Sequence, residues 1–203
     1  MSLQAVFARI AQIDEIVSPQ PPAASAATGT SGFLSTLEGV QHSSALSTTA
    51  PMLGGGTAGQ RALAAAQTEV GVAEQPPGSN DGPRIAEYRA ATAGSGVGPW
   101  CAYFTSWCAS QAGAPLCEVG QGFGSVDAVY AWAQRTGRAI PAGPGVSPSP
   151  GDLIVWGGRH IGIVESVDPD GSIHTIEGNS SNAVSRRTYG PDGGGATGYV
   201  RLG

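Results

Sequence analysis

The stretch that decides the fold covers residues 98–110 and has the sequence GPWCAYFTSWCAS. Pro99 is followed by more than ten residues without a helix breaker, and large apolar side chains recur at helical spacing, which predicts a buried amphipathic helix. Pro99 suits the start of a helix, so Cys101 falls in the first turn. Unpaired backbone N–H groups and the helix dipole stabilise a thiolate there. Cys101 is a candidate nucleophile, although a small core residue would fit the same pattern.

Around this stretch, apolar spacing predicts helices first and strands afterwards. Further helices are expected at residues 61–72, 84–93 and 125–136. From Gly151 the apolar period changes to two, which predicts strands at residues 153–156, 160–167, 172–178, 185–189 and 199–202. Helices followed by an antiparallel β-meander make an α+β fold rather than an alternating βαβ fold.

A β-hairpin with its turn near residues 168–171 is expected to bring chemistry-bearing residues together. Its simplest register pairs residues whose numbers sum to 339, beginning with Val167 and Ser172. Side chains alternate along a strand, so the two members of each pair share a face of the sheet. A slip of one residue would separate the polar residues described next.

In that register three polar residues share one face. His160 falls opposite Asn179, and Glu177 can reach the ring diagonally across the space that Gly162 leaves. An imidazole held by a carboxylate or an amide is what a thiol needs as its general base. Glu177 is preferred as the orienting group because a charge stabilises an imidazolium, whereas Asn179 would only aim the ring. His174 has the opposite parity and is expected to be structural or on the surface.

Four motifs together resemble the CHAP family, papain-like cysteine amidases and endopeptidases that cut bacterial peptidoglycan. They are PWCA at 99–102, PGDL at 150–153, HIGIV at 160–164 and IEGN at 176–179, and the resemblance covers about residues 60–203. It implies a papain-like fold with Cys101 as nucleophile, His160 as base, and Glu177 and Asn179 as orienting groups. No cofactor is implied. Some relatives bind calcium in an acidic loop before the cysteine, but residues 93–100 hold no carboxylate here, so no metal site is expected.

The sequence therefore predicts a peptidoglycan hydrolase that cleaves an amide bond, as an N-acetylmuramoyl-L-alanine amidase or as a peptide endopeptidase. Trp100 and Gly158 are candidate substrate-binding residues, and the backbone N–H of Cys101 is a candidate oxyanion donor. One alternative is a non-catalytic cell-wall-binding or structural module of a phage or export apparatus, which would not need the thiol. Another is an acyltransferase that uses the same site.

The composition argues against several other classes of function. The chain has 203 residues and a formal net charge of −5, and no basic cluster exceeds Arg186–Arg187, so nucleic-acid binding is not favoured. No apolar run approaches the roughly 18 residues of a membrane span. Cys108 and Cys117 could form a disulfide in an oxidising compartment or stay as two buried thiols.

Two regions are expected before the catalytic domain at residues 59–203. Residues 1–17 carry a helical apolar stripe and predict an amphipathic helix, which needs a surface to pack on and could dock a protein partner. Residues 18–58 are rich in Ala, Ser, Thr, Gly and Pro and predict a disordered linker. The N-terminus lacks the apolar region of a secretory signal peptide. We therefore expect action at the cell wall or outside the cell by another route, such as an export apparatus or phage lysis, and otherwise a cytoplasmic protein.

Overall fold

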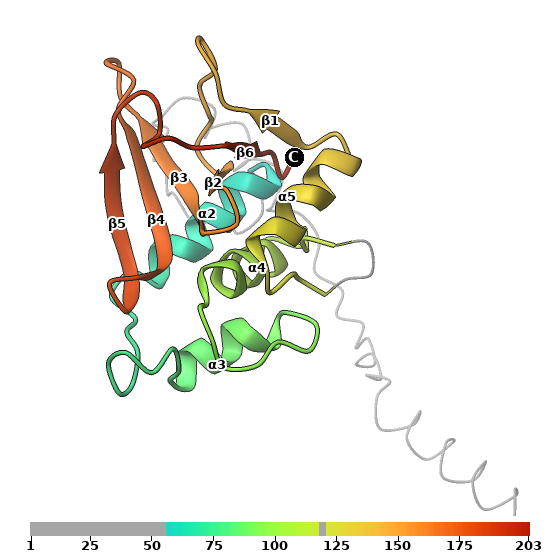
Figure 1. Ribbon diagram of the computed structural model, residues 1–203, viewed down its shortest axis with the longest axis vertical. Coiled ribbons are helices and arrows are strands. Elements are labelled where there is room, and N and C mark those ends of the chain that lie inside the picture. The colour runs from blue at the N-terminus through green and yellow to red at the C-terminus, as the bar shows by residue number, and fades with distance from the viewer. Residues whose placement is uncertain (1–55, 118–120) are drawn as a thin grey trace, which may run out of the picture. The chain divides into compact units, whose positions relative to one another are not determined.

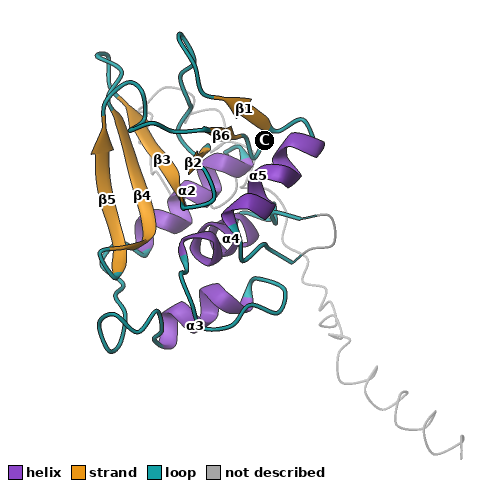
Figure 2. Ribbon diagram, viewed as in Figure 1, coloured by secondary structure: helices purple, strands orange, loops and turns teal. Residues whose placement is uncertain are grey.

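The computed structural model describes residues 56–117 and 121–203 (Figure 1). The predicted N-terminal helix at residues 1–17 lies outside the described residues, as does the predicted linker at 18–58 except for its last three positions. The described part contains four helices and six strands, and every helix precedes every strand in the sequence. Figure 2 shows the helices in purple and the strands in orange. This order confirms the predicted α+β class. No helix in the described part is long and apolar enough to cross a membrane.

The first described helix, α2 (Ala58–Thr68), begins three residues before the predicted start at Arg61. Thr57 caps it: the Thr57 hydroxyl accepts from the Gln60 N–H at 3.2 Å, and the Gln60 side chain accepts from the Thr57 N–H at 3.0 Å. This reciprocal capping box fixes where the helix starts. Its threonine–x–x–glutamine pattern is visible in the sequence, so a start judged from the apolar face alone falls too late.

The cysteine-bearing helix lies among the other elements and is buried on nearly every side. The remaining helices are α3 (Pro83–Ala90), α4 (Cys101–Gln111) and α5 (Val126–Arg135). In α4 the first nine residues are buried except Trp107, which is half-buried, because the helix contacts α2, α3, α5 and two strands. The prediction of an amphipathic helix is therefore wrong in this respect: a helix packed all round has no polar face.

The six strands form one antiparallel sheet in the order β1-β6-β2-β3-β4-β5. They are β1 (Ala139–Pro141), β2 (Leu153–Trp156), β3 (His160–Val167), β4 (Ile173–Ser180), β5 (Ala183–Tyr189) and β6 (Gly198–Val200). The predicted meander is confirmed for β2 to β5. The last strand differs, because β6 returns to pair with β2, and the short β1, which was not predicted, pairs with β6. At the start of β5, on the outer edge of the sheet, Ala183 forms an isolated antiparallel β-bridge with Ala73.

A β-bulge in the β3–β4 hairpin preserves the predicted register where it matters. Near the turn Val167 pairs with Ile173, so the predicted pairing with Ser172 is wrong by one residue. The register then shifts between Val164 and Ser166, and Val164 pairs with Thr175, whose numbers sum to the predicted 339. One extra residue on β3 cancels the longer turn. The pairs of Val164 with Thr175 and of Ile163 with Ile176, which lead toward His160 and Glu177, therefore have the predicted register.

Each face of the sheet has its own apolar core. The helix-covered face contributes Leu153, Val155, Ile161, Ile163, Ile176 and Val200 to the larger core. The other face contributes Ile154, Trp156, Val164, Ile173 and Tyr199 to a smaller one. A close approach joins the sheet to the cysteine helix, because a Cβ atom on Gly178 would lie 2.5 Å from Cβ of Phe104. Only glycine allows α4 to pack this closely against β4.

Candidate active site

Cys101 is the first residue of α4 and is buried, with 4% of its surface exposed. The preceding residue, Trp100, is the N-cap, and no side chain caps this end of the helix. The N–H groups of the first turn therefore stay available to a negatively charged group at the thiol. A helix start with these properties offers a backbone N–H donor beside the thiol sulfur.

His160 begins β3 and links the cysteine to a carboxylate. Its Nε2 lies 2.8 Å from Oε2 of Glu177, and its ring lies close enough to the Cys101 thiol for the thiol to raise the pKa of His160. Since Nε2 is taken by Glu177, Nδ1 is the nitrogen that remains for the thiol. The indole of Trp156 stacks on the imidazole with ring centroids 5.6 Å apart. The ring is thus held from three directions.

Glu177 is the most strongly bonded carboxylate of the site. It is 1% exposed, and its Oε1 accepts from the hydroxyls of Thr175 at 2.6 Å and Tyr189 at 2.9 Å. Burial raises the pKa of Glu177, but the hydrogen bonds from His160, Thr175 and Tyr189 outweigh it, so the pKa lies below its usual range. Glu177 therefore stays negatively charged beside the imidazole.

The charge state of His160 follows from the same contacts. Burial lowers the pKa of His160, whereas its hydrogen bonds with Cys101 and Glu177 raise it, and the net result is a pKa of about 9. The ring therefore carries its second proton at neutral pH. A protonated imidazole between a carboxylate and a thiol is one half of a thiolate–imidazolium pair.

Gly162 provides the space through which Glu177 reaches His160. A Cβ atom at Gly162 would lie 2.7 Å from Cγ of Glu177 and 3.3 Å from the backbone oxygen of Ile176. No larger residue fits there without moving the carboxylate. The diagonal contact between His160 and Glu177 across Gly162, predicted from the hairpin register, is present at 2.8 Å.

Asn179 is not brought against the imidazole. It adopts a left-handed backbone conformation with φ of 57°, and the β4–β5 register is irregular between Glu177 and Ser180. The alternation of side chains therefore fails just before this position. With its amide turned to match its neighbours, Asn179 accepts from the backbone N–H of Trp100 and donates to Oε1 of Glu74, both at 3.2 Å.

The comparisons with known proteins agree with this arrangement. A family model described as CHAP domain matches residues 92–179, a range that includes Cys101, His160, Glu177 and Asn179. This part of the chain is a CHAP domain. The predicted recognition is confirmed, and a cysteine at the start of a central helix facing a histidine on an antiparallel sheet is the expected papain-like arrangement.

Among solved structures, the described fold is similar to the peptidoglycan hydrolase RipB from Mycobacterium tuberculosis. The two chains share 18% sequence identity with a TM-score of 0.43, and the match covers 71% of this chain and 64% of the other. This chain thus spans just under two thirds of the length of that relative. No curated protein matches the sequence.

The two predicted substrate-binding residues of the CHAP domain have different surroundings. Trp100 is fully buried, and its indole Nε1 donates to Oε1 of Glu74 at 2.9 Å. Its side chain therefore supports the site from within, which corrects the expectation that it touches substrate. Gly158 is exposed in the β2–β3 turn, where a Cβ atom would meet the carboxylate of Asp127 at 2.5 Å. A role of Gly158 in substrate binding stays a prediction.

Sequence reasoning missed several residues that hold the site together, although some left a signal. Thr175 shares the predicted face of Glu177, and extending the register to the next strand would have added Tyr189. Trp156 pairs directly with His160 across the β2–β3 turn. No pattern in the sequence pointed to Glu74, because a carboxylate in a loop before α3 looks solvated.

The other two cysteines and Asp81 take no part in the site. All three cysteines are free, and burial raises the pKa of the Cys108 thiol. Asp81, which comes before the cysteine helix, pairs with Arg89 at 3.0 Å. Within residues 56–117 and 121–203, no three His, Cys, Asp or Glu side chains are grouped so that they could hold a metal ion.

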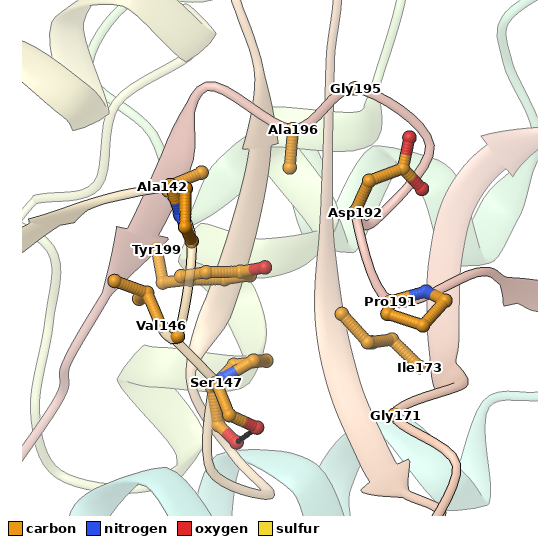
Figure 3. A pocket seen from close by; sticks show the side chains of 14 residues that line it. Ala142, Val146, Ser147, Gly171, Ile173, Pro191, Asp192, Gly195, Ala196 and Tyr199 are labelled. Carbon is orange, nitrogen blue, oxygen red and sulfur yellow. Dashed lines mark hydrogen bonds between the residues drawn. The ribbon is translucent and has the colours of Figure 1, made fainter.

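A cavity of about 690 Å³ lies elsewhere on the sheet (Figure 3). Tyr199 and Ile173 from the smaller core line it, together with Asp192 and two loops at residues 142–148 and 190–196. Ile173 is four residues from Glu177 along β4, which corresponds to about 13 Å at 3.3 Å per residue. The cavity shares no lining residue with the cysteine site.

Proposed function

We propose that this CHAP domain hydrolyses an amide bond of bacterial peptidoglycan through a thiolate at Cys101. The observation that carries the proposal is that His160 bonds to the buried Glu177 and lies beside the Cys101 thiol, which is at an uncapped helix start. A binding module needs neither a nucleophile nor a charged imidazole beside it. The substrate class is the one that the CHAP family resemblance implies.

In the first half-reaction the Cys101 sulfur attacks the carbonyl carbon of the amide. The oxygen becomes an oxyanion, for which the backbone N–H of Cys101 is the candidate donor. The C–N bond then breaks, and His160 gives its proton to the leaving nitrogen. The products are a free amine and a thioester between Cys101 and the acyl group, with His160 now neutral.

In the second half-reaction water releases the acyl group. Neutral His160 takes a proton from a water molecule while the oxygen attacks the thioester carbon. The C–S bond breaks, which gives a carboxylic acid and restores the thiolate–imidazolium pair. Glu177 keeps the imidazole in place throughout and favours its charged form. Every step uses groups of this chain and water.

The test is digestion of purified bacterial peptidoglycan, with the fragments analysed by mass spectrometry after the new amines have been labelled. The wild-type protein should release soluble fragments, and Cys101→Ala should release none. Cys108→Ala removes a buried thiol outside the site and should keep most activity. Labelled L-alanine N-termini would identify an N-acetylmuramoyl-L-alanine amidase, and any other labelled amine a peptide endopeptidase. Binding without fragments would overturn the proposal in favour of a non-catalytic wall-binding module.

Alkylation of the thiols gives a second test that needs no substrate. At about pH 6 an ordinary thiol hardly reacts with iodoacetamide, whereas a thiolate held in an ion pair does. Cys101 should be labelled and Cys108 should not. Equal resistance of both thiols would count against the thiolate mechanism whatever the digestion shows.

A further inference from the structure

A buried carboxylate connects the two halves of the active site, outside the Cys101–His160–Glu177 series. Glu74 is 2% exposed, and its Oε1 accepts from the indole of Trp100 at 2.9 Å and from the amide of Asn179 at 3.2 Å. Trp100 immediately precedes Cys101, and Asn179 comes two residues after Glu177. We propose that Glu74 is a positioning residue for the reaction: it holds Trp100 and Asn179, and through them it aims the backbone N–H of Cys101.

The position of Glu74 is itself fixed by the sheet. Its backbone N–H donates to the oxygen of Asn182 at 2.9 Å. Just before it, Val72 accepts from the N–H of Val184 at 2.8 Å, and Ala73 forms a bridge with Ala183. The segment thus runs antiparallel to the start of β5. A carboxylate anchored in this way is a fixed point against which the helix start can be aligned.

The carboxylate also decides which way the Asn179 amide faces. A carboxylate oxygen only accepts hydrogen bonds, so the NH2 group of Asn179 has to face Glu74. The amide oxygen then faces the backbone N–H of Trp100, from which it accepts at 3.2 Å. Without the carboxylate, either end of the amide could face the helix start, and one orientation would set two donors against each other.

The same contacts hold Trp100 at its backbone N–H and at its side chain. Its N–H is bound by Asn179 and its indole by Glu74, while its φ and ψ are −114° and 18°. The ψ angle of Trp100 sets the direction of the next N–H group, which belongs to Cys101. This N–H is the candidate oxyanion donor of the proposed hydrolysis. An N–H aimed at the developing charge lowers the barrier far more than one that is misdirected.

One atom of Glu74 indicates that the carboxylate is not there for stability. Its Oε2 is buried and has no hydrogen-bond partner among the described residues. A buried carboxylate oxygen without a partner destabilises a fold, and an apolar side chain would pack against Trp100 without that cost. Such departures from optimal stability are expected at functional sites.

The test compares variants of Glu74 with a matched carboxylate variant. Glu69 is 6% exposed, lies in the same segment and bonds to Arg84 and Tyr88 rather than to the cysteine helix start. Glu74→Ala should lower kcat for peptidoglycan hydrolysis by about ten-fold to a hundred-fold with KM changed by less than about three-fold. Glu69→Ala should leave kcat near the wild-type value. All rates are taken well below the Tm of each variant.

Two further readouts separate positioning from a general loss of structure. Glu74 touches neither His160 nor Glu177 in any hydrogen bond of the structure, so the alkylation rate of Cys101 against pH should be the same in Glu74→Ala and wild type. Glu74→Gln keeps an acceptor oxygen in the same place and should recover most of kcat. If Glu74→Ala does not fold, Glu74→Asp, which withdraws the carboxylate by one methylene, carries the same expectation.

The activity part of this inference rests on the proposed function, so one measurement is made without substrate. In NMR spectra the side-chain NH2 of Asn179 and the indole N–H of Trp100 should shift in Glu74→Ala and stay in place in Glu69→Ala. A wild-type protein that cleaves no peptidoglycan would overturn the proposed function, while these signals would still decide whether Glu74 holds the two residues. Unshifted signals, a kcat within about two-fold of wild type, or a parallel loss of alkylation would overturn the positioning role.

Discussion

Two histidine–carboxylate pairs lie on the same hairpin, and only one of them lies beside the proposed nucleophile. In both pairs Nε2 of the histidine lies 2.8 Å from a carboxylate oxygen: His160 with Glu177, and His174 with Asp168. In the second pair Nδ1 of His174 lies 3.0 Å from the hydroxyl of Thr188. Taken by distance alone, this threonine, histidine and aspartate would pass for the centre of a hydrolase.

The surroundings of the two pairs differ in burial and in what faces Nδ1. The Glu177 side chain is 2% exposed and receives two further hydroxyls, whereas the Asp168 side chain is 49% exposed. An exposed ion pair is screened by water and contributes little to stability. His160 also lies beside a thiol at a helix start, whereas Thr188 is within β5 and not at a helix start. Burial and a thiol beside the ring, rather than the contact distance, distinguish the proposed catalytic pair from the pair of His174 and Asp168.

The largest difference in activity between the two pairs should appear when the thiol beside His160 or the hydroxyl beside His174 is removed. Cys101→Ala should lower peptidoglycan hydrolysis by about a thousand-fold or more with the fold retained, because the bond-forming atom is lost. The pKa of His160 should also fall from about 9, since its contacts with Cys101 raise it. Activity assays and NMR titration of the ring protons measure both effects. Thr188→Ala is the control, and its activity should stay near wild type.

The next largest difference should appear when each carboxylate becomes an amide. Glu177→Gln should lower activity by about a hundred-fold, because the imidazolium loses its charged partner. His160 must be protonated for the ion pair, and a lower pKa means that it loses its proton at a lower pH. The alkaline limb of the Cys101 alkylation profile should therefore move to lower pH. Asp168→Asn should move neither rate nor limb, and an unchanged limb in Glu177→Gln would contradict the assigned role of the carboxylate.

The raised pKa of His160 also makes the free energy of unfolding depend on pH. The folded-state pKa of His160, about 9, lies above its usual 6.5. Its contribution to the free energy of unfolding is therefore complete below about pH 6.5 and is lost as the pH rises through 9. Denaturant unfolding of wild type should show this loss. In Glu177→Gln the loss should be complete at a lower pH.

The sequence predicted the contact between His160 and Glu177 because its geometry is local. Alternation along a strand and a hairpin register place Glu177 near His160, and Gly162 marks the space between them. The prediction succeeded although the turn was misjudged, since the bulge at Glu165 cancelled an error of one residue. A register counted from the turn alone carries this risk in any hairpin.

The sequence did not predict the contacts of Asn179. Side chains stop alternating between the two faces of the sheet where the backbone adopts a left-handed conformation. A φ of 57° at Asn179 sends its amide to the helix start instead of the imidazole. Asparagine tolerates this conformation better than most residues, so its presence after Gly178 was a signal that could have been read. Glu74 gave no such signal: its contacts join segments distant in sequence, which no local period encodes.

A smaller effect should follow from filling the gap between the catalytic residues. Gly162→Ala would place a Cβ atom 2.7 Å from Cγ of Glu177, so the carboxylate must move away from His160. Activity should fall by about ten-fold, and the free energy of unfolding by about 1 to 3 kcal/mol as in other overpacked cores. Rates and denaturant midpoints measure the two effects. At Gly143 an added Cβ meets nothing within 4 Å, so Gly143→Ala should change neither.

The smallest effect should come from single hydroxyls, and two neighbours on β5 provide a matched pair. Tyr189 donates to Glu177 at 2.9 Å, and Thr188 bonds to the ring of His174 at 3.0 Å. Tyr189→Phe removes one of three hydrogen bonds to a buried carboxylate, so the free energy of unfolding should fall by about 1 to 2 kcal/mol. Glu177 keeps its bonds to His160 and Thr175 and stays charged, so activity should fall by only about two-fold to five-fold, and the alkaline limb should not move to lower pH as it does in Glu177→Gln. Thr188→Val removes one exposed hydroxyl and should change neither stability nor rate by a measurable amount.

Equal effects of the two substitutions would mean that burial does not separate the two histidine–carboxylate pairs. The alkaline limb could instead move as far in Tyr189→Phe as in Glu177→Gln. That result would show that the tyrosine hydroxyl, rather than the carboxylate alone, sets the charge of His160.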